Sequence, residues 1–276
     1  MTDFLQAVIQ HEFMRNALLA ALLSSLACGV VGSYVVVRRI SYLAGAIAHC
    51  ALGGIGVARY LQVVHGWTVF SPLLGALLAA WLCALAIGAL HLWGRERMDT
   101  AIGALWGLGM AIGILFMART PGYAPDLMGY IFGNILLVSP GDLMITVLLD
   151  VSVLTVGALF FKAFSAICFD EEFSRLRGLP ARALYLVLLL LIATTVVLLV
   201  SIVGIVMVII LLTLPAALAG RFSRRLLPMM ALAALFCALA STTGLAISYR
   251  FDLPAGPAII LSITLPYILL HRRNKE

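Results

Sequence analysis

The chain has 276 residues, of which 63% are hydrophobic and only 11% carry a charged side chain. Soluble domains have about 45–50% apolar and about 25% charged residues, so this composition excludes an ordinary soluble domain. Lipid-exposed loops and open sheet edges do not cross hydrocarbon, and the sequence lacks the alternating ten-residue strands of a membrane barrel. We therefore predict an all-α polytopic membrane protein that forms a single transmembrane domain over residues 1–276.

Nine segments of the chain are predicted to cross the membrane. The apolar stretch 183–220 is too long for one crossing of about 30 Å and holds two short spans, with a turn expected at 201–204. One misjudged span there would leave eight crossings instead of nine. The predicted spans are 16–37, 38–65, 71–93, 99–117, 142–164, two within 183–220, 226–247 and 258–270.

Two shorter segments lie outside these spans. Residues 3–15 mix apolar and polar side chains in the pattern of a short interfacial helix. Pro121, Gly122 and Pro125 end the fourth span, because proline and glycine break a continuous helix. The apolar piece from Leu127 to Val138 is too short to cross hydrocarbon, so we expect it to be re-entrant or to lie along the interface.

The basic residues indicate the orientation. The net charge of +6 comes from 18 basic and 12 acidic residues, and most basic residues gather in short loops, which is a topology signal and not a nucleic-acid footprint. We expect these loops and the C-terminus to be cytoplasmic and the N-terminus, which lacks the features of a cleavable signal, to be external after nine crossings. The basic loops are 38–39, 95–97, 162–182, 221–225 and 272–275.

The sequence argues against an enzyme. Its only lysines, Lys162 and Lys275, follow Phe and Asn, so the chain has no phosphate-binding loop of the form GxxxxGK[ST]. It also lacks HExxH, paired CxxC and a closely spaced carboxylate dyad, which argues against a metalloprotease or a glycosidase-like site. We expect no bound cofactor. The scattered cysteines are expected to be small buried residues and not disulfide partners; they are Cys28, Cys50, Cys83, Cys168 and Cys237.

The second predicted span carries one histidine on a stripe of small residues. On a helix, Gly45, His49 and Gly53 are spaced i, i+4, i+8 and share a face, with Gly56 close by. Such a stripe lets another backbone approach closely, and a polar group at depth faces the protein interior or a watery cavity. His49 is therefore either a helix-packing residue or a transition-metal ligand in a translocation path. Cys50 is a weaker candidate, because adjacent side chains diverge by about 100° on a helix.

A polar stretch after the fifth span predicts a short helix outside the membrane. Acidic residues at its start and arginines at its end match the helix dipole, and a glycine followed by proline ends it. This helix is either an ordinary connection or a docking element for a cytoplasmic partner. Its residues are Asp170, Glu171, Glu172, Phe173, Arg175, Arg177 and Gly178, within about 169–179.

Six segments, in this order, resemble the membrane subunit of the zinc/manganese/iron permease family of ATP-binding-cassette importers. The segment at 38–58 is similar to the family's RRMS(x)₂GDxL(S/A)H stretch. The six segments are RRISYLAGAIAHCALGGIGVA at 38–58, MDTAIG at 98–103, DLMGYIFGNILLVSP at 126–140, FDEEFSRLRGLP at 169–180, VGIVMVIILLTLPAALA at 203–219 and SYRFDLPAGPAIIL at 248–261.

The resemblance implies a permease in the bacterial inner membrane that dimerises about a central pore, with itself or with a related permease. It would sit on two copies of a separate ATPase, which binds the ATP, and receive cargo from an extracytoplasmic metal-binding protein. Residues 170–178 would be the coupling helix that engages the ATPase. In the family an acid and a histidine four residues apart on the second helix are thought to meet the ion, and the histidine corresponds to His49.

The acid of that pair is replaced by Gly45, and a later proline of the family is replaced by Gly53. A divalent cation at low dielectric needs an anionic ligand to offset its lost hydration. Three outcomes follow: weak binding, another acid in its place, or a cargo other than a bare cation. Among the acids, Asp150 alone lies well inside a predicted span, either as a packing residue or as a functional carboxylate.

The predicted function is thus the permease subunit of an ATP-driven importer for a divalent transition metal ion, with zinc placed first and manganese or iron next. A permease for a metal chelate or siderophore is the alternative that keeps the same architecture. A secondary transporter is a further alternative, although such proteins usually show two repeats and discontinuous helices, and no repeat is visible in the sequence.

Overall fold

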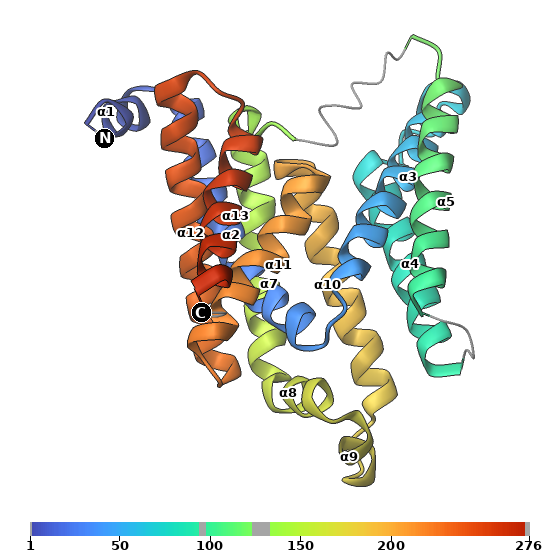
Figure 1. Ribbon diagram of the computed structural model, residues 1–276. Helices are drawn as coiled ribbons and strands as arrows, with labels where there is room; N and C mark the ends of the chain where they lie inside the picture. The colour runs from blue at the N-terminus through green and yellow to red at the C-terminus, as the bar shows by residue number, and fades with distance from the viewer. Residues whose placement is uncertain (1, 94–97, 123–132, 274–276) are drawn as a thin grey trace. The chain divides into compact units, whose positions relative to one another are not determined.

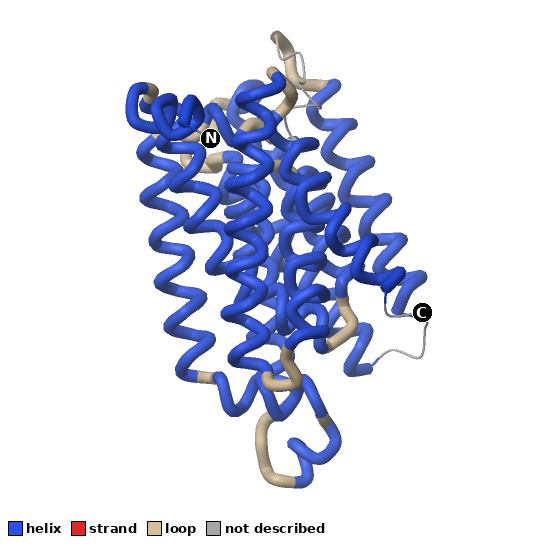
Figure 2. Tube along the Cα trace, turned by 60° about the vertical axis from the view of Figure 1, so that its left-hand side comes forward, coloured by secondary structure: helices blue, strands red, loops and turns tan. Residues whose placement is uncertain are grey.

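The structure is a computed structural model that describes residues 2–93, 98–122 and 133–273. Over these ranges all the regular elements are helices, which confirms the predicted all-α class (Figures 1 and 2). The elements are α1 (Thr2–Gln10), α2 (Glu12–Val37), α3 (Ser41–His65), α4 (Pro72–Trp93), α5 (Met98–Ala118), the 3-10 helix η1 (Ile135–Leu137), α7 (Pro140–Leu159), α8 (Phe161–Phe169), α9 (Glu171–Leu176), α10 (Ala181–Val203), α11 (Ile205–Phe222), α12 (Leu226–Phe251) and α13 (Ala255–Arg273).

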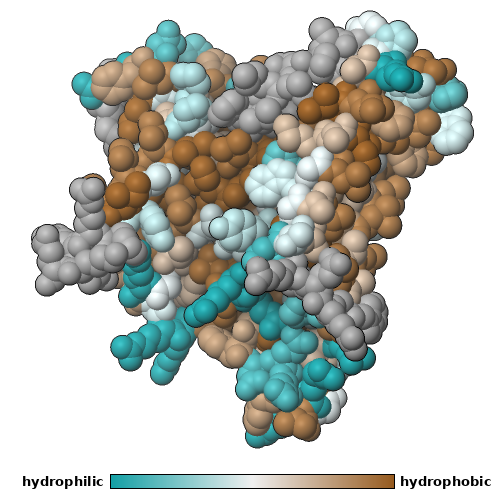
Figure 3. Space-filling view, turned by 45° about the vertical axis from the view of Figure 1, so that its right-hand side comes forward, coloured by the Kyte–Doolittle hydropathy of each residue, from teal (hydrophilic) through white to brown (hydrophobic). Residues whose placement is uncertain are grey.

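Eight of the described helices are long and apolar enough to cross a membrane: α2, α3, α4, α5, α7, α10, α11 and α12. The apolar part of α13, Ala255–Leu270, is shorter than these. The prediction of eight or nine spans is therefore confirmed. Figure 3 shows the corresponding surface, where brown apolar side chains cover most of the helix flanks in view.

Gly204 separates α10 from α11. Its φ of 81° and ψ of 163° lie outside the region open to other residues, and helices run up to Val203 and onward from Ile205. The structure thus confirms the break that the sequence places at 201–204. The predicted re-entrant piece falls largely outside the described residues; of that stretch, the structure describes η1, which the Asn134 side chain caps by accepting from the N–H of Leu136 at 3.2 Å.

The helices form two compact units. The first contains α1, α2, η1, α7, α11, α12, α13 and the last residues of α10. Within it, α2 contacts α7, α11 and α12. Close approach depends on glycine: a methyl group built on Gly29 would lie 2.6 Å from Cβ of Ala234, and one built on Gly32 would overlap the carbonyl of Leu212.

The second unit contains α3, α4, α5, α8, α9 and most of α10. Within it α3 contacts both α4 and α5, as Figure 1 shows. Gly54 and Gly75 bring the backbones of α3 and α4 together, since a methyl group on either one would collide with the other's carbonyl. The Trp81 indole N–H of α4 donates to Thr194 Oγ1 of α10 at 3.0 Å.

Candidate functional site

The small-residue stripe of α3 packs against α5. A methyl group built on Gly53 would lie 2.7 Å from the carbonyl oxygen of Gly109, and one built on Gly56 would lie 2.6 Å from that of Gly113. The two backbones are therefore in direct contact, which only glycine allows. This is the tight helix contact that the spacing predicts. A role for these glycines in lining a path stays a prediction.

Trp106 of α5 packs against two positions of this stripe, His49 and Gly45. Its ring stacks on the His49 imidazole with a centroid distance of 4.7 Å and an interplanar angle of 24°. A methyl group on Gly45 would lie 2.6 Å from Cζ3 of the same ring. The indole thus occupies the space into which a side chain at position 45 would project, and an acid there requires Trp106 to move.

His49 is half-buried, and its Nδ1 is buried without a hydrogen-bond partner. Most metal-binding histidines have their second ring nitrogen held by a carboxylate, carbonyl or water. Over the part of the chain that the structure describes, no group of three or more His, Cys, Asp or Glu side chains is placed to hold a metal ion. A role for His49 as a ligand of a passing ion stays a prediction.

Asp150 lies on α7 in the first unit, whereas His49 lies on α3 in the second. Only 3% of Asp150 is exposed, and both of its carboxyl oxygens are buried. A buried carboxyl group in a membrane helix is energetically unfavourable and is a functional candidate by default. Its role stays a prediction.

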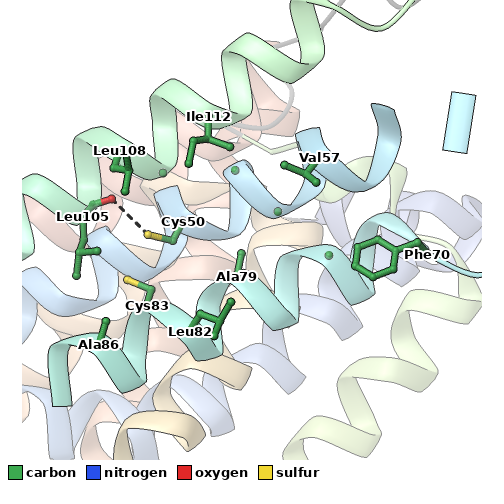
Figure 4. A pocket seen from close by; sticks show the side chains of 14 residues that line it. Cys50, Val57, Phe70, Ala79, Leu82, Cys83, Ala86, Leu105, Leu108 and Ile112 are labelled. Atoms are coloured by element: carbon green, nitrogen blue, oxygen red, sulfur yellow. Dashed lines mark hydrogen bonds between the residues drawn. The ribbon is translucent and has the colours of Figure 1, made fainter. Parts of the chain in front are cut away.

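Cys50 lines a pocket of about 440 Å³ between α3, α4 and α5 (Figure 4). Its Sγ–H donates to the carbonyl of Leu105 at 3.3 Å. Cys83 of α4 faces it across the floor of the pocket (Figure 4). The sequence singles out Cys50 but gives no sign of this partner, because the pairing depends on how α3 and α4 pack.

The predicted helix outside the spans is α9. The Asp170 carboxylate caps it by accepting from the N–H of Phe173 at 2.8 Å. At the other end, Gly178 has a φ of 79°, its N–H donates to the carbonyl of Arg175 at 3.0 Å, and the N–H of Leu179 donates to that of Ser174 at 3.1 Å. These two bonds form a Schellman motif, so both ends of α9 are fixed by local sequence.

The outer surface of α9 is apolar at its centre and charged around it. Phe173 is 52% exposed and Leu176 is 83% exposed. The Arg177 guanidinium lies 5.0 Å from the centre of the Phe173 ring. The remaining charged residues, Glu172 and Arg175, are also exposed. An exposed aromatic side chain surrounded by charged side chains is typical of a docking surface.

One link between α9 and a spanning helix is not visible in the sequence. The imidazole Nε2 of His91, in the last turn of α4, lies 3.7 Å from a carboxylate oxygen of Glu171. The same imidazole packs on Tyr185 of α10 with a ring-centroid distance of 4.8 Å. The His91 imidazole thus contacts both α9 and α10, within one unit.

Comparisons with known proteins agree with this architecture. The profile of the ABC 3 transport family matches residues 10–272. A protein of Chlamydia pneumoniae named "probable metal transport system membrane protein" is 41% identical over 90% of this chain and 85% of its own length. The "manganese transport system membrane protein MntC" of Halalkalibacterium halodurans is 31% identical, over 95% of this chain and 87% of its own.

A solved structure extends the likeness to three dimensions. PsaBC from Streptococcus pneumoniae, in complex with Fab, matches with a TM-score of 0.85 and 29% sequence identity, covering 97% of this chain and 94% of the other. Since the family profile and these relatives each match almost the whole chain, the protein belongs to the ABC 3 transport family.

Proposed function

We propose that the chain is the permease subunit of an ATP-driven importer that moves a divalent transition metal ion across the bacterial inner membrane. The observation that carries this proposal is the nearly full-length match to relatives named as manganese and metal transport membrane proteins. Those names favour manganese as the cargo over zinc, which the sequence places first, with iron as a further candidate.

The partners follow from the same proposal. A cytoplasmic ATPase, in two copies, docks on α9 and binds the ATP; the centre of its contact is Phe173, with Glu172 and Arg175 around it. A second permease, identical or related, completes the path, and an extracytoplasmic metal-binding protein delivers the ion. The C-terminus is cytoplasmic, as the basic tail predicts.

His49 is the proposed point of contact with the ion during passage. A neutral imidazole is a ligand for many transition metals but offers no charge to offset lost hydration. In its own unit, Trp106 occupies the place of the missing acid at Gly45. We therefore expect a weakly held, partly hydrated ion, which suits a path that must release its cargo after each alternation between outward and inward states.

The test is uptake of radiolabelled manganese by the complex reconstituted in proteoliposomes. His49→Ala should lower uptake by about tenfold or more, since even outer partners of metal ligands contribute that much. His65→Ala, a change of the same type at the end of α3, is the matched control and should leave uptake unchanged. Assembly with the ATPase should be normal in both variants. Full uptake by His49→Ala would remove this residue from the path.

A permease for a metal chelate remains the second candidate, favoured by the absence of an acid at Gly45 beside His49. The two functions differ in what competes for uptake. Free manganese should saturate and block the path of an ion importer. Competition only by a preformed chelate, with no effect of the free ion, would favour the second candidate.

A further inference from the structure

The pocket between α3, α4 and α5 has a chemistry that the proposed function does not use. Its walls are apolar side chains and glycine backbone, including Val57, Phe70, Leu82 and Ile112, and its floor carries the thiols of Cys50 and Cys83 (Figure 4). Its lining contains no carboxylate, imidazole, lysine or arginine. The pocket therefore offers a ligand two sulfur atoms in an otherwise apolar space.

The two thiols are positioned to act together. The sulfur atoms of Cys50 and Cys83 face each other across the floor of the pocket, and the Cys50 thiol donates to the carbonyl of Leu105 at 3.3 Å (Figure 4). Both cysteines are buried in the helix packing, yet they line the pocket. Because Cys50 is on α3 and Cys83 on α4, one ligand that bonds to both sulfurs would link the two helices.

Charge decides which ligand fits. Manganese favours oxygen ligands and water, and this lining offers neither carboxylates nor other anionic oxygen groups. A charged complex would also be costly in an apolar space inside a membrane. The fitting ligand has a soft centre, takes two thiolates and becomes neutral in doing so.

We propose that Cys50 and Cys83 form a binding site for trivalent arsenic compounds of the arsenoxide class, R–As=O. Each thiol sulfur forms a bond to arsenic, the As=O bond breaks, and the two thiol protons leave with the oxygen as one molecule of water. Arsenic stays trivalent, so no oxidant or reductant is required. The adduct is neutral, its pyramidal arsenic holds two sulfurs side by side, and the group R lies in the apolar pocket.

The chain contains an internal control for this site. Cys28 of α2 and Cys237 of α12 are a second pair of neighbouring cysteines, but they are 2% and 0% exposed. The close approach of α2 and α12 at Gly29 and Ala234 fills their surroundings. An arsenoxide should therefore react with the pocket pair and leave the packed pair unmodified.

The test uses phenylarsine oxide on the intact complex in nanodiscs, followed by intact-mass measurement of this chain. The wild type and the double variant Cys28→Ser/Cys237→Ser should each bind one phenylarsenic group that resists a monothiol and is released by a dithiol. Cys50→Ser and Cys83→Ser should each lose this resistant adduct. Cys50→Ala and Cys83→Ala, checked for assembly by size-exclusion chromatography, replace any serine variant that fails to fold.

Three results would overturn the proposal: no adduct on the wild type, a resistant adduct on the Cys50 or Cys83 variants, or loss of the adduct in the Cys28/Cys237 variant. Manganese uptake is measured on the same variants as the mass. Linking α3 to α4 should block manganese uptake in the wild type, and uptake by the Cys83→Ser variant should persist in phenylarsine oxide. Because the adduct is measured by mass, its result is independent of whether manganese is the cargo.

Discussion

Trp106 gives a physical reason for the glycine at position 45. The indole face that stacks on His49 also lies against Gly45, so the two α3 positions share one neighbour on α5. An aspartate at 45 would bring a carboxylate against the ring, whose face carries negative charge density, and would be desolvated in the helix packing. Gly45 and Trp106 therefore fit each other, and placing a side chain at position 45 while Trp106 is kept is expected to lower stability.

We predict that Gly45→Asp lowers stability by about 1–3 kcal/mol, the usual cost of overpacking a helix contact. The double variant Gly45→Asp/Trp106→Ala should recover much of that loss, because it removes the ring that the new side chain meets. Thermal unfolding of the purified chain in detergent measures both effects. Additive losses in the double variant would show that Trp106 and position 45 are not coupled.

Asp150 is a residue whose burial argues for function over packing. Both carboxyl oxygens lie buried, which costs stability. We predict that Asp150→Asn leaves thermal stability unchanged or raises it by about 1 kcal/mol, while manganese uptake falls. The neighbouring change Val151→Ala, at a site that is 57% exposed, is the control. Uptake that equals the control would make Asp150 a packing residue.

At the scale of elements, the close α3–α5 contact of the second unit is open to a direct test. Gly53→Leu should destabilise the chain by about 1–3 kcal/mol or more, since its side chain would meet the backbone of Gly109. Gly103→Leu on α5 is the matched control, because a methyl group built there meets no atom within 4 Å. Thermal unfolding should separate the two variants, and equal losses would contradict this packing.

Local signals of the sequence were sufficient to predict many helix ends. Asp170, Gly178 and Gly204 act through their own backbone neighbourhood, so capping and breaking rules identify them without knowledge of the fold. Trp106 and His91 could not be found this way. Their partners lie on other helices, and the sequence contains no rule for which helices meet.

The α3–α5 pairing shows which part of the packing the sequence predicts and which part only the structure shows. The stripe of small residues around His49 predicts that some helix packs there, and Trp106, Gly109 and Gly113 form a spaced stripe of their own on α5. Each stripe is visible in the sequence, but only the structure matches one to the other. The same holds for Cys50 and Cys83, which are separated by a turn and most of two helices.

The outer surface of α9 carries a further prediction. Phe173→Ala should leave the fold intact, because the ring is 52% exposed, but should weaken ATPase docking and lower the ATPase stimulation that accompanies uptake. Val69→Ala, an exposed apolar residue in the loop between α3 and α4, is the control. Co-purification of the ATPase and its hydrolysis rate are the measurements. Wild-type values for both in Phe173→Ala would place the docking surface elsewhere.

At the scale of the whole molecule, the contacts of α13 favour nine crossings over eight. Its apolar part spans about 24 Å at 1.5 Å per residue, which is short of about 30 Å of hydrocarbon. Yet near its beginning α13 packs through Ile259 on Gly244, which lies in the second half of α12. Near its end, the Arg221 guanidinium lies 4.9 Å from the centre of the Tyr267 ring. Arg221 belongs to the basic loop expected in the cytoplasm, so we expect α13 to run back to that side. We predict that alkaline phosphatase fused after Pro254 is active and that a green fluorescent protein fused after the last residue is fluorescent. An active phosphatase at the C-terminus would instead leave α13 on the outer face and make the count eight.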